Sequence, residues 1–224
     1  MQRERPSLSW YDRHAAAFER TRPDLPGERE FYRWLARATR PPLLVLACGT
    51  GRIALALAAV SGPVIGLDRS AAMLAVARAA SPREPHLHWV RGDMRAFAFG
   101  CRFGLICVPF RSLQHLLTEA EQIAALRCCA VHLQPGGRLA FSLSNPQPLR
   151  RLLARFAPAG RPVPAPSALY GGHPQAPIRY WEPDNVRALL QAAGLEVERV
   201  AGGFLGEPLT PRSMEQVWVA RRPA

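Results

Sequence analysis

The residues with the clearest chemical potential are a pair of glycines. Gly49 and Gly51 follow the apolar run 43–46 and precede a run of helix-forming residues, which predicts a strand, a tight turn and a helix. A residue without a Cβ atom adopts positive φ easily and lets the backbone approach a ligand closely. The free N–H groups at a helix start suit the negative or electron-rich end of a nucleotide-like cofactor.

Two aspartates extend this candidate site. Asp68 ends the short apolar run 64–68, and Asp93 follows the run 87–90. In an open parallel sheet ligands bind at the carboxyl ends of the strands, so Asp68 is placed where it could accept hydrogen bonds from a diol. Residues 49–54 also satisfy the dinucleotide pattern Gly-x-Gly-x-x-Gly/Ala, which keeps a nicotinamide-dependent enzyme as an alternative.

The elements that would position these residues alternate between strand and helix. Two helices, 7–20 and 28–39, come first, and Pro41-Pro42 then introduce the first strand. The expected strands are 43–46, 64–68, 87–90, 103–108, 138–143, 196–200 and 215–220, and the later helices are 53–59, 72–77, 118–133 and 184–193. This alternation predicts a parallel α/β sheet. The last two strands are too close for a crossover helix, so we expect them to pair antiparallel.

Regular patterning lapses between residues 145 and 183, where the sequence contains nine prolines and few periodic apolar positions. An irregular segment of this length in a compact domain is either disordered or a functional lid. We expect one domain over residues 1–224, in which 1–40 form cap helices and 145–183 form a lid insertion.

Composition is that of an ordinary globular protein, with 48% hydrophobic and 21% charged residues. No apolar run approaches the roughly 18 residues that span a bilayer, and the N-terminus leads into no apolar signal region. We therefore expect a cytoplasmic location and no membrane partner. The five cysteines show neither metal-ligand spacing nor a secreted disulfide pattern, so we expect no metal.

The formal charge of +12 raises the question of nucleic-acid binding, but all 29 basic residues are arginine, which is typical of a GC-rich coding bias. No acidic residue lies between Glu121 and Glu182, whereas this stretch holds Arg127, Arg138, Arg150, Arg151, Arg155, Arg161 and Arg179. Such a local field could attract an anionic acceptor or a polyanion. A solvated basic surface is the favoured interpretation.

Taken together, these segments resemble the class I S-adenosylmethionine-dependent methyltransferases, in particular the small single-domain enzymes that act on small molecules. The similarity runs from about Phe31 to Arg221 and rests on 43–57, 66–70 with 73–74, 92–94, 103–116 and 133–138. The similarity depends on the order and spacing of these segments together rather than on any single segment. The resemblance implies a Rossmann-like sheet of seven strands in the order 3-2-1-4-5-7-6, with strand 7 antiparallel and helices on both faces.

The resemblance also implies a cofactor, S-adenosyl-L-methionine, and the residues that hold it. Ala47, Gly49 and Gly51 would line its methionine part, and Asp68, next to Arg69, would accept both ribose hydroxyls. Met73 would pack near the adenine, Asp93 would accept from its amino group, and the Met94 N–H would meet the ring. Val108 would border the reactive methyl, and Tyr11 would close over the cofactor.

Two positions depart from the family pattern. Val45 stands where the family usually has Asp or Glu, and Gly104 stands where an Asp commonly begins the fourth strand. Loss of the first acid removes the usual water-mediated hold on the cofactor's amino group, so we expect a lower cofactor affinity.

The chemistry of such an enzyme is in-line displacement at an electrophilic sulfonium methyl, achieved mainly by holding the acceptor in place and excluding water. A general base helps only where the acceptor carries a proton in the transition state. The candidates are His14, His115, His173, Tyr170 and Glu182. His115 comes first because it follows the fourth strand closely, although a packed structural histidine is the favoured interpretation.

The predicted acceptor contacts are His14, Phe110 and Arg111, of which Arg111 could pair with an acceptor carboxylate or phosphate. The expected function is methyl transfer to a small-molecule acceptor. One alternative is an RNA methyltransferase, but Val108-Pro109-Phe110 lacks the Asn/Asp-Pro-Pro-Tyr motif and the chain shows no separate RNA-binding module. The other is a cofactor-binding subunit without catalytic activity. The sequence leaves open the acceptor, the methylated atom and the oligomeric state.

Overall fold

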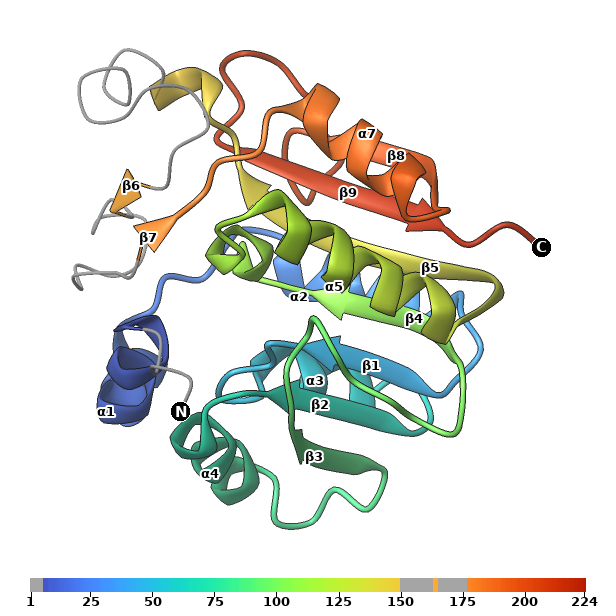
Figure 1. Ribbon diagram of the computed structural model, residues 1–224. Helices are drawn as coiled ribbons and strands as arrows, with labels where there is room; N and C mark the ends of the chain where they lie inside the picture. Colours follow the sequence, from blue (N-terminus) through green and yellow to red (C-terminus); the bar gives the residue numbers. More distant parts are fainter. Residues whose placement is uncertain (1–5, 150–162, 165–176) are drawn as a thin grey trace.

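A seven-stranded sheet forms the centre of the protein in the computed structural model, which describes residues 6–149, 163–164 and 177–224 (Figure 1). Its strands are β1 (Leu43–Leu46), β2 (Val64–Asp68), β3 (Leu87–Arg91), β4 (Phe103–Val108), β5 (Leu133–Ser144), β8 (Glu196–Ala201) and β9 (Glu215–Arg221). Two short strands, β6 (Val163–Pro164) and β7 (Pro177–Ile178), pair separately.

The order of the sheet is β3-β2-β1-β4-β5-β9-β8. β1 lies between β2 and β4 and runs parallel to both, and β3 and β5 continue the parallel arrangement outward. β9 is antiparallel to both β5 and β8. The expected Rossmann-like order with an antiparallel last strand is therefore confirmed.

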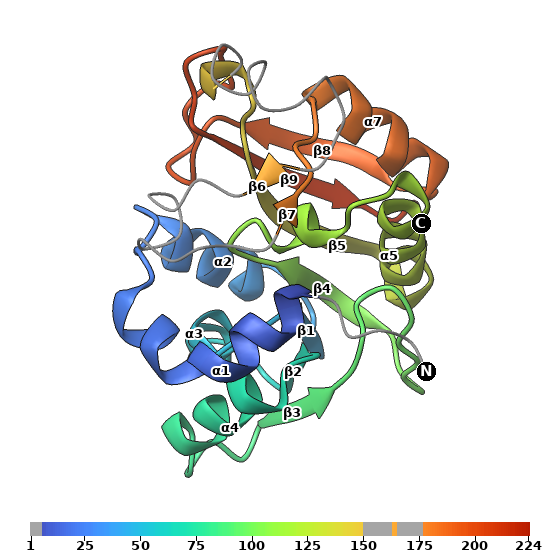
Figure 2. The same ribbon diagram turned by 60° about the vertical axis from the view of Figure 1, so that its left-hand side comes forward.

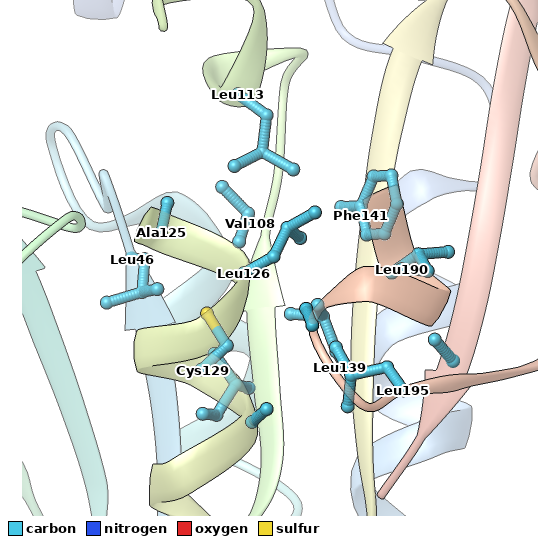
Figure 3. Close-up of a cluster of buried hydrophobic side chains, with 14 of the residues drawn as sticks. Leu46, Val108, Leu113, Ala125, Leu126, Cys129, Leu139, Phe141, Leu190 and Leu195 are labelled. Atoms are coloured by element: carbon cyan, nitrogen blue, oxygen red, sulfur yellow. The ribbon is translucent and has the colours of Figure 1, made fainter. Parts of the chain in front are cut away.

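Helices cover both faces of the sheet. They are α1 (Pro6–Thr21), α2 (Glu28–Arg37), α3 (Arg52–Ala58), α4 (Ala71–Ala80), α5 (Glu119–His132) and α7 (Pro183–Ala192), with short 3-10 turns η1 (Ser112–His115) and η2 (Gln147–Leu149). α5 and α7 pack on one face through Leu126 and Leu190, which meet Leu139 and Phe141 of β5 (Figure 3). α2 and α3 cover the other face. Because both faces are covered, β1 and β4 are buried along their whole length.

Local sequence signals explain where these helices begin. Ser70 precedes α4, and its Oγ accepts the Met73 N–H at 3.1 Å. Thr118 precedes α5 and forms a reciprocal capping box with Glu121. The N-terminal boundaries of both helices are therefore set by side chains that replace missing backbone partners.

β5 begins at Leu133, five residues before the expected start at Arg138. The expected turn is nevertheless present as an irregularity in the pairing with β4, because Phe103 pairs with Leu133 and Leu105 pairs with Arg138. Gly136 adopts positive φ there, and its N–H donates to the Arg222 carbonyl at 3.0 Å. The turn is thus absorbed into the strand.

α1 lies beyond the carboxyl ends of the parallel strands and packs against α4 (Figures 1 and 2). Most of the expected lid, residues 145–183, lies outside the described residues. In the ranges that the structure describes, every helix is too short or too polar to cross a lipid bilayer.

Candidate active site

A pocket lies at the carboxyl ends of β1, β2, β3 and β4, underneath α1. It brings together eight of the ten residues predicted to hold the cofactor: Tyr11, Ala47, Gly49, Asp68, Arg69, Met73, Asp93 and Met94. Phe110 and His115 also line it. The described elements therefore gather most of the predicted residues in one place.

The two glycines of the loop after β1 have different surroundings. Gly49 has φ of +56°, lines the pocket, and a Cβ added to it would meet no atom within 4 Å. Gly51 has φ of +93° and does not line the pocket, and a Cβ there would lie 2.5 Å from the ring of Trp89. Gly49 thus leaves room for a ligand beside the backbone. Gly51 leaves room for the packing of Trp89.

The Asp68 carboxylate is held by the two loops that flank it. Its Oδ2 accepts the Gly49 N–H at 2.8 Å, and its Oδ1 accepts the Ser70 N–H at 2.9 Å. Burial raises the pKa of Asp68 above its ordinary value, although the N–H donors oppose this change. Each oxygen retains a lone pair, so the carboxylate can still accept hydrogen bonds from a diol in the pocket.

The Asp93 carboxylate is paired within the protein. Arg95 donates to it through Nε at 3.0 and 3.1 Å and through Nη2 at 2.6 Å, and Arg95 Nη1 donates to Glu121 at 2.7 Å. Burial alone would raise the pKa of Asp93, but the bonds and charge of Arg95, with Arg69, lower it below its ordinary value. Arg95 stands only two positions from Asp93, whereas its bond to Glu121, 26 positions away, could not be predicted from the sequence.

Aromatic rings wall the side of the pocket near α1. Tyr11 Oη lies 3.1 Å from His115 Nε2, within hydrogen-bond distance. The Phe18 ring meets Tyr11 at 5.6 Å and Phe110 at 6.0 Å, both edge to face. Burial lowers the pKa of His115 to about 4, so this imidazole is neutral at pH 7. A neutral imidazole can accept a hydrogen bond from a protonated nucleophile.

Polar contacts tie α1 to the loops of the pocket. Ser70 Oγ donates to Asp12 at 2.5 Å, and Thr50 Oγ1 donates to Glu19. Burial opposes a low pKa at Glu19, yet the bonds from Arg22 and Thr50 lower the pKa below its ordinary value. These contacts connect α1 with the glycine loop and with the end of β2.

Arg111 takes a different place from the expected one. It is 3% exposed, and its Nε donates to both oxygens of Glu215 at 3.1 Å. A side chain engaged in this way is not offered to an acceptor carboxylate. This pairing could not be predicted from the sequence, because Glu215 lies on β9, 104 positions away.

Three other predicted residues also lie outside the pocket lining: Gly51, Val108 and His14. Val108 is fully buried in the core at the end of β4. His14 stacks on Trp10 with ring centroids 4.7 Å apart and donates from Nδ1 to the Trp10 carbonyl at 2.9 Å. Of the other base candidates, Glu182 accepts from Gln147 at 2.7 Å, and Tyr170 and His173 lie outside the described residues.

The structure shows what surrounds Val45 and Gly104, the two positions that depart from the family pattern. Val45 is fully buried in β1, between Gly66 of β2 and Cys107 of β4. At Gly104 a Cβ would lie 1.9 Å from the Arg40 carbonyl oxygen. The close approach of the Arg40 backbone therefore excludes any side chain at position 104.

The pocket fits an adenosyl cofactor. The open space beside Gly49 admits a ligand against the backbone, Asp68 offers oxygens for ribose hydroxyls, and Met73 supplies an apolar wall. Over the described ranges, no three His, Cys, Asp or Glu side chains gather closely enough to hold a metal ion.

Comparison with known protein families finds a family described as "Methyltransferase domain", whose profile matches residues 43–137. This match covers the glycine loop, the two aspartates and the segment that carries His115. One relative is the dTDP-3-amino-3,6-dideoxy-alpha-D-glucopyranose N,N-dimethyltransferase of Streptomyces fradiae, 46% identical over 95 residues. The match covers 42% of this chain and only 36% of that enzyme.

Other known proteins match the chain over most of its length, beyond residues 43–137. The Cypemycin N-terminal methyltransferase of a Streptomyces species is 29% identical over 206 residues, covering 80% of this chain and 82% of that enzyme. The Ubiquinone biosynthesis O-methyltransferase of Thiobacillus denitrificans is 31% identical over 187 residues, covering 80% and 75%. The solved structure of the CcbJ methyltransferase from Streptomyces caelestis has the same fold, with a TM-score of 0.78, 24% identity and coverage of 96% and 98%. This chain belongs to the class I S-adenosylmethionine-dependent methyltransferases.

Proposed function

We propose that this protein transfers a methyl group from S-adenosyl-L-methionine to an amine nitrogen of a small-molecule acceptor. The observation that carries the proposal is the pair formed by Tyr11 and His115, 3.1 Å apart in the wall of the pocket. Both side chains line the same pocket as Asp68, so a nucleophile bound beside the cofactor could reach them. A neutral imidazole there suits a nucleophile that carries a proton.

The protein's part in the reaction is mainly positioning. When bound, the cofactor supplies a methyl group on a positively charged sulfur, which needs no further activation. Asp68 and the backbone at Gly49 would hold the ribose and the methionine part, and Met73 would pack near the adenine. α1 would cover the pocket and exclude water from it. The walls of the pocket would hold the acceptor in line with the methyl.

His115 would receive a hydrogen bond from the acceptor N–H and orient its lone pair toward the methyl carbon. Proton acceptance by a positioned side chain contributes typically ~10²–10⁴-fold to a rate. Its low pKa keeps it neutral but also makes it a weak base, so orientation is the larger part of its role. Tyr11, within hydrogen-bond distance of Nε2, would fix the direction of the imidazole ring.

The names of two relatives support nitrogen as the methylated atom, since one is an N,N-dimethyltransferase and another an N-terminal methyltransferase. A dTDP-linked amino sugar and cypemycin, the compounds in those names, favour an acceptor of secondary metabolism. The O-methyltransferase among the relatives makes hydroxyl acceptors the necessary comparison in any assay.

An anionic acceptor is not favoured, because Arg111, the residue expected to bind one, is paired with Glu215. The RNA alternative also loses support. Arg138, one of the arginines in the acid-free stretch, pairs with Glu198 of β8 at 2.8 Å. This pairing neutralises part of the positive field that suggested nucleic acid.

We further propose that residues 1–224 act as one methyltransferase domain, in which residues 1–40 cap the pocket and 145–183 serve as its lid. The contacts of α1 with Ser70 and Thr50 support the first assignment. We place the enzyme in the cytoplasm, consistent with its five cysteines being free thiols.

The test incubates the purified protein with methyl-labelled cofactor and a panel of amino sugars, peptide amines and matched hydroxyl compounds. We expect label transfer to amines and formation of S-adenosylhomocysteine. His115→Gln should lower kcat by about 10- to 1000-fold, while His88→Gln, at an exposed position on β3, should leave it unchanged. Binding of the cofactor without transfer to any acceptor would support the non-catalytic alternative. Thermal stabilisation by NAD and none by S-adenosylhomocysteine would support the nicotinamide alternative.

A further inference from the structure

The turn that follows β4 has an uncommon backbone. Phe110 and Arg111 are consecutive non-glycine residues with φ of +54° and +62°. Side chains rarely adopt this left-handed conformation, and residues held in it persist only where the surrounding structure imposes it. Some feature of the surroundings must therefore hold this turn.

One holding group is the carboxylate of Glu28, the first residue of α2. Glu28 is completely buried, and its Oε1 accepts the Phe110 N–H at 3.2 Å. Its Oε2 accepts a hydrogen bond from the Arg52 guanidinium. Arg52 is the first residue of α3 and follows Gly51 directly. A single carboxylate thus connects the end of the glycine loop with the turn after β4.

A second contact holds the other half of the turn. The Arg111 N–H donates to Ser142 Oγ at 3.4 Å, and its guanidinium is paired with Glu215. These groups anchor Arg111 to β5 and β9. The Phe110 N–H is bound by Glu28, and the Phe110 ring packs against Phe18.

The position of Phe110 matters for the pocket. Its ring lines the pocket and meets Phe18 of α1 edge to face at 6.0 Å. The short turn η1 begins at Ser112, directly after Arg111, and ends at His115. The conformation at Phe110 therefore sets the direction in which the chain enters the segment that carries His115.

We propose that Glu28 is a positioning residue for methyl transfer: it couples the cofactor loop to the acceptor wall by holding Arg52 and the Phe110 turn with one buried carboxylate. The proposal rests on the proposed function, since it assigns Phe110 and His115 to the acceptor side. A purely structural role explains less, because a buried ion pair is a weak device for stability and a well-packed apolar pair often replaces it without loss.

The first measurement needs no activity. Hydrogen–deuterium exchange of the peptide covering residues 108–116 is compared in the wild type, Glu28→Gln and Glu28→Ala. Loss of a hydrogen bond to a charged group should speed exchange there by about 10- to 100-fold in Glu28→Ala. Glu30→Ala is the matched control, because Glu30 lies on the same helix, carries the same charge and has a side chain 69% exposed. It should leave this peptide unchanged.

The second measurement asks whether Glu28 acts through Phe110. We expect Glu28→Ala to lower kcat by about 10-fold or more, with the dissociation constant of S-adenosylhomocysteine changed less than about 3-fold. In a double-mutant cycle, Glu28→Ala should add little to the effect of Phe110→Ala, because both remove the same wall. Glu28→Gln keeps an oxygen for the Phe110 N–H, so it should recover part of kcat and serves as the test if Glu28→Ala does not fold.

The results separate this proposal from the proposed function. If the wild type transfers no methyl group, the proposed function fails, and the exchange measurement still tests the contact between Glu28 and the turn. If the wild type is active but Glu28→Gln and Glu28→Ala behave like Glu30→Ala, or the cycle is additive, the positioning role is overturned.

Discussion

At the scale of single residues, the two glycines of the loop after β1 have separate roles although they stand two positions apart. Gly49 borders open space in the pocket, whereas Gly51 lies against the Trp89 ring. Both adopt positive φ, so any side chain would be strained at either position. Only at Gly51 would the new Cβ also collide with the core.

This difference predicts that Gly51→Ala mainly lowers the stability of the protein, whereas Gly49→Ala mainly weakens cofactor binding. Gly51→Ala should lower the free energy of unfolding by about 3 kcal/mol or more, because backbone strain and the clash with Trp89 add. Gly49→Ala should cost about 1–2 kcal/mol from strain alone but weaken S-adenosylhomocysteine binding more than about 10-fold. Urea denaturation and calorimetry measure the two effects. Equal loss of stability in both variants would contradict the assignment.

The burial of His115 predicts a pH dependence of folding stability that can be assigned to this residue. Its pKa is about 4 in the folded protein and near the ordinary value of 6.5 in the unfolded chain. The unfolded state therefore binds more protons between pH 6.5 and 4, so His115 makes the protein less stable as the pH falls through this range. Above pH 6.5 the effect is absent because His115 is neutral in both states.

The expected result is a difference between two unfolding curves measured from pH 7 to pH 4. The wild type should lose stability over this range by more than His115→Gln, which has no titrating group at that position. Thermal unfolding at a series of pH values measures the difference, and His88→Gln serves as the control at an exposed site. Parallel curves for the wild type and His115→Gln would mean that His115 titrates normally.

At the scale of elements, α1 attaches to the fold mainly through α4. Its buried apolar residues, Ala15 and Phe18, form a small cluster with Met73 of α4 that is separate from the two main cores. Polar contacts through Asp12 and Glu19, the hydrogen-bond contact of Tyr11 with His115 and the ring contact of Phe18 with Phe110 also attach α1. An element held by few buried apolar contacts opens at a lower free energy than the sheet.

Removing the central ring of this cluster should therefore detach α1 without unfolding the protein. We expect Phe18→Ala to speed hydrogen exchange across α1 and to weaken S-adenosylhomocysteine binding by about 10-fold or more. The urea midpoint of the sheet should shift little. Trp34→Ala, at a side chain 53% exposed on α2, is the matched aromatic control. Cooperative loss of the whole fold in Phe18→Ala would contradict a separately attached helix.

At the scale of the whole molecule, the net charge of +12 is the excess that remains after the 17 acidic residues are counted against the 29 arginines. Arg138 pairs with Glu198, Arg221 with Glu196, and Arg95 with Asp93. These ion pairs leave the net charge unchanged but place a carboxylate beside each of the three arginines, which makes them less available for phosphate contacts. The remaining excess can still support weak, non-specific association.

We therefore expect binding to RNA that is weak and falls steeply with salt. A filter-binding titration between about 50 and 200 mM salt should show the affinity decreasing by at least about 10-fold. No methyl group should be transferred to RNA at any salt concentration in the labelled-cofactor assay. Salt-resistant binding accompanied by turnover would instead establish RNA as the acceptor.

The sequence by itself determined the fold, because its signals are local. Apolar runs of strand length, glycine turns and capping residues such as Ser70 and Thr118 act within a few positions of where they stand. The same applies to Gly49, Asp68 and Asp93, which end neighbouring strands and so had to meet at one edge of the sheet.

Only the tertiary structure decided which polar groups remain available for a ligand. Arg111 looks free in the sequence, yet Glu215, 104 positions away on β9, pairs with its guanidinium. The link from Glu28 to the Phe110 turn joins residues 82 positions apart. Such pairings depend on which elements the fold brings together, and no periodicity or spacing along the chain records them.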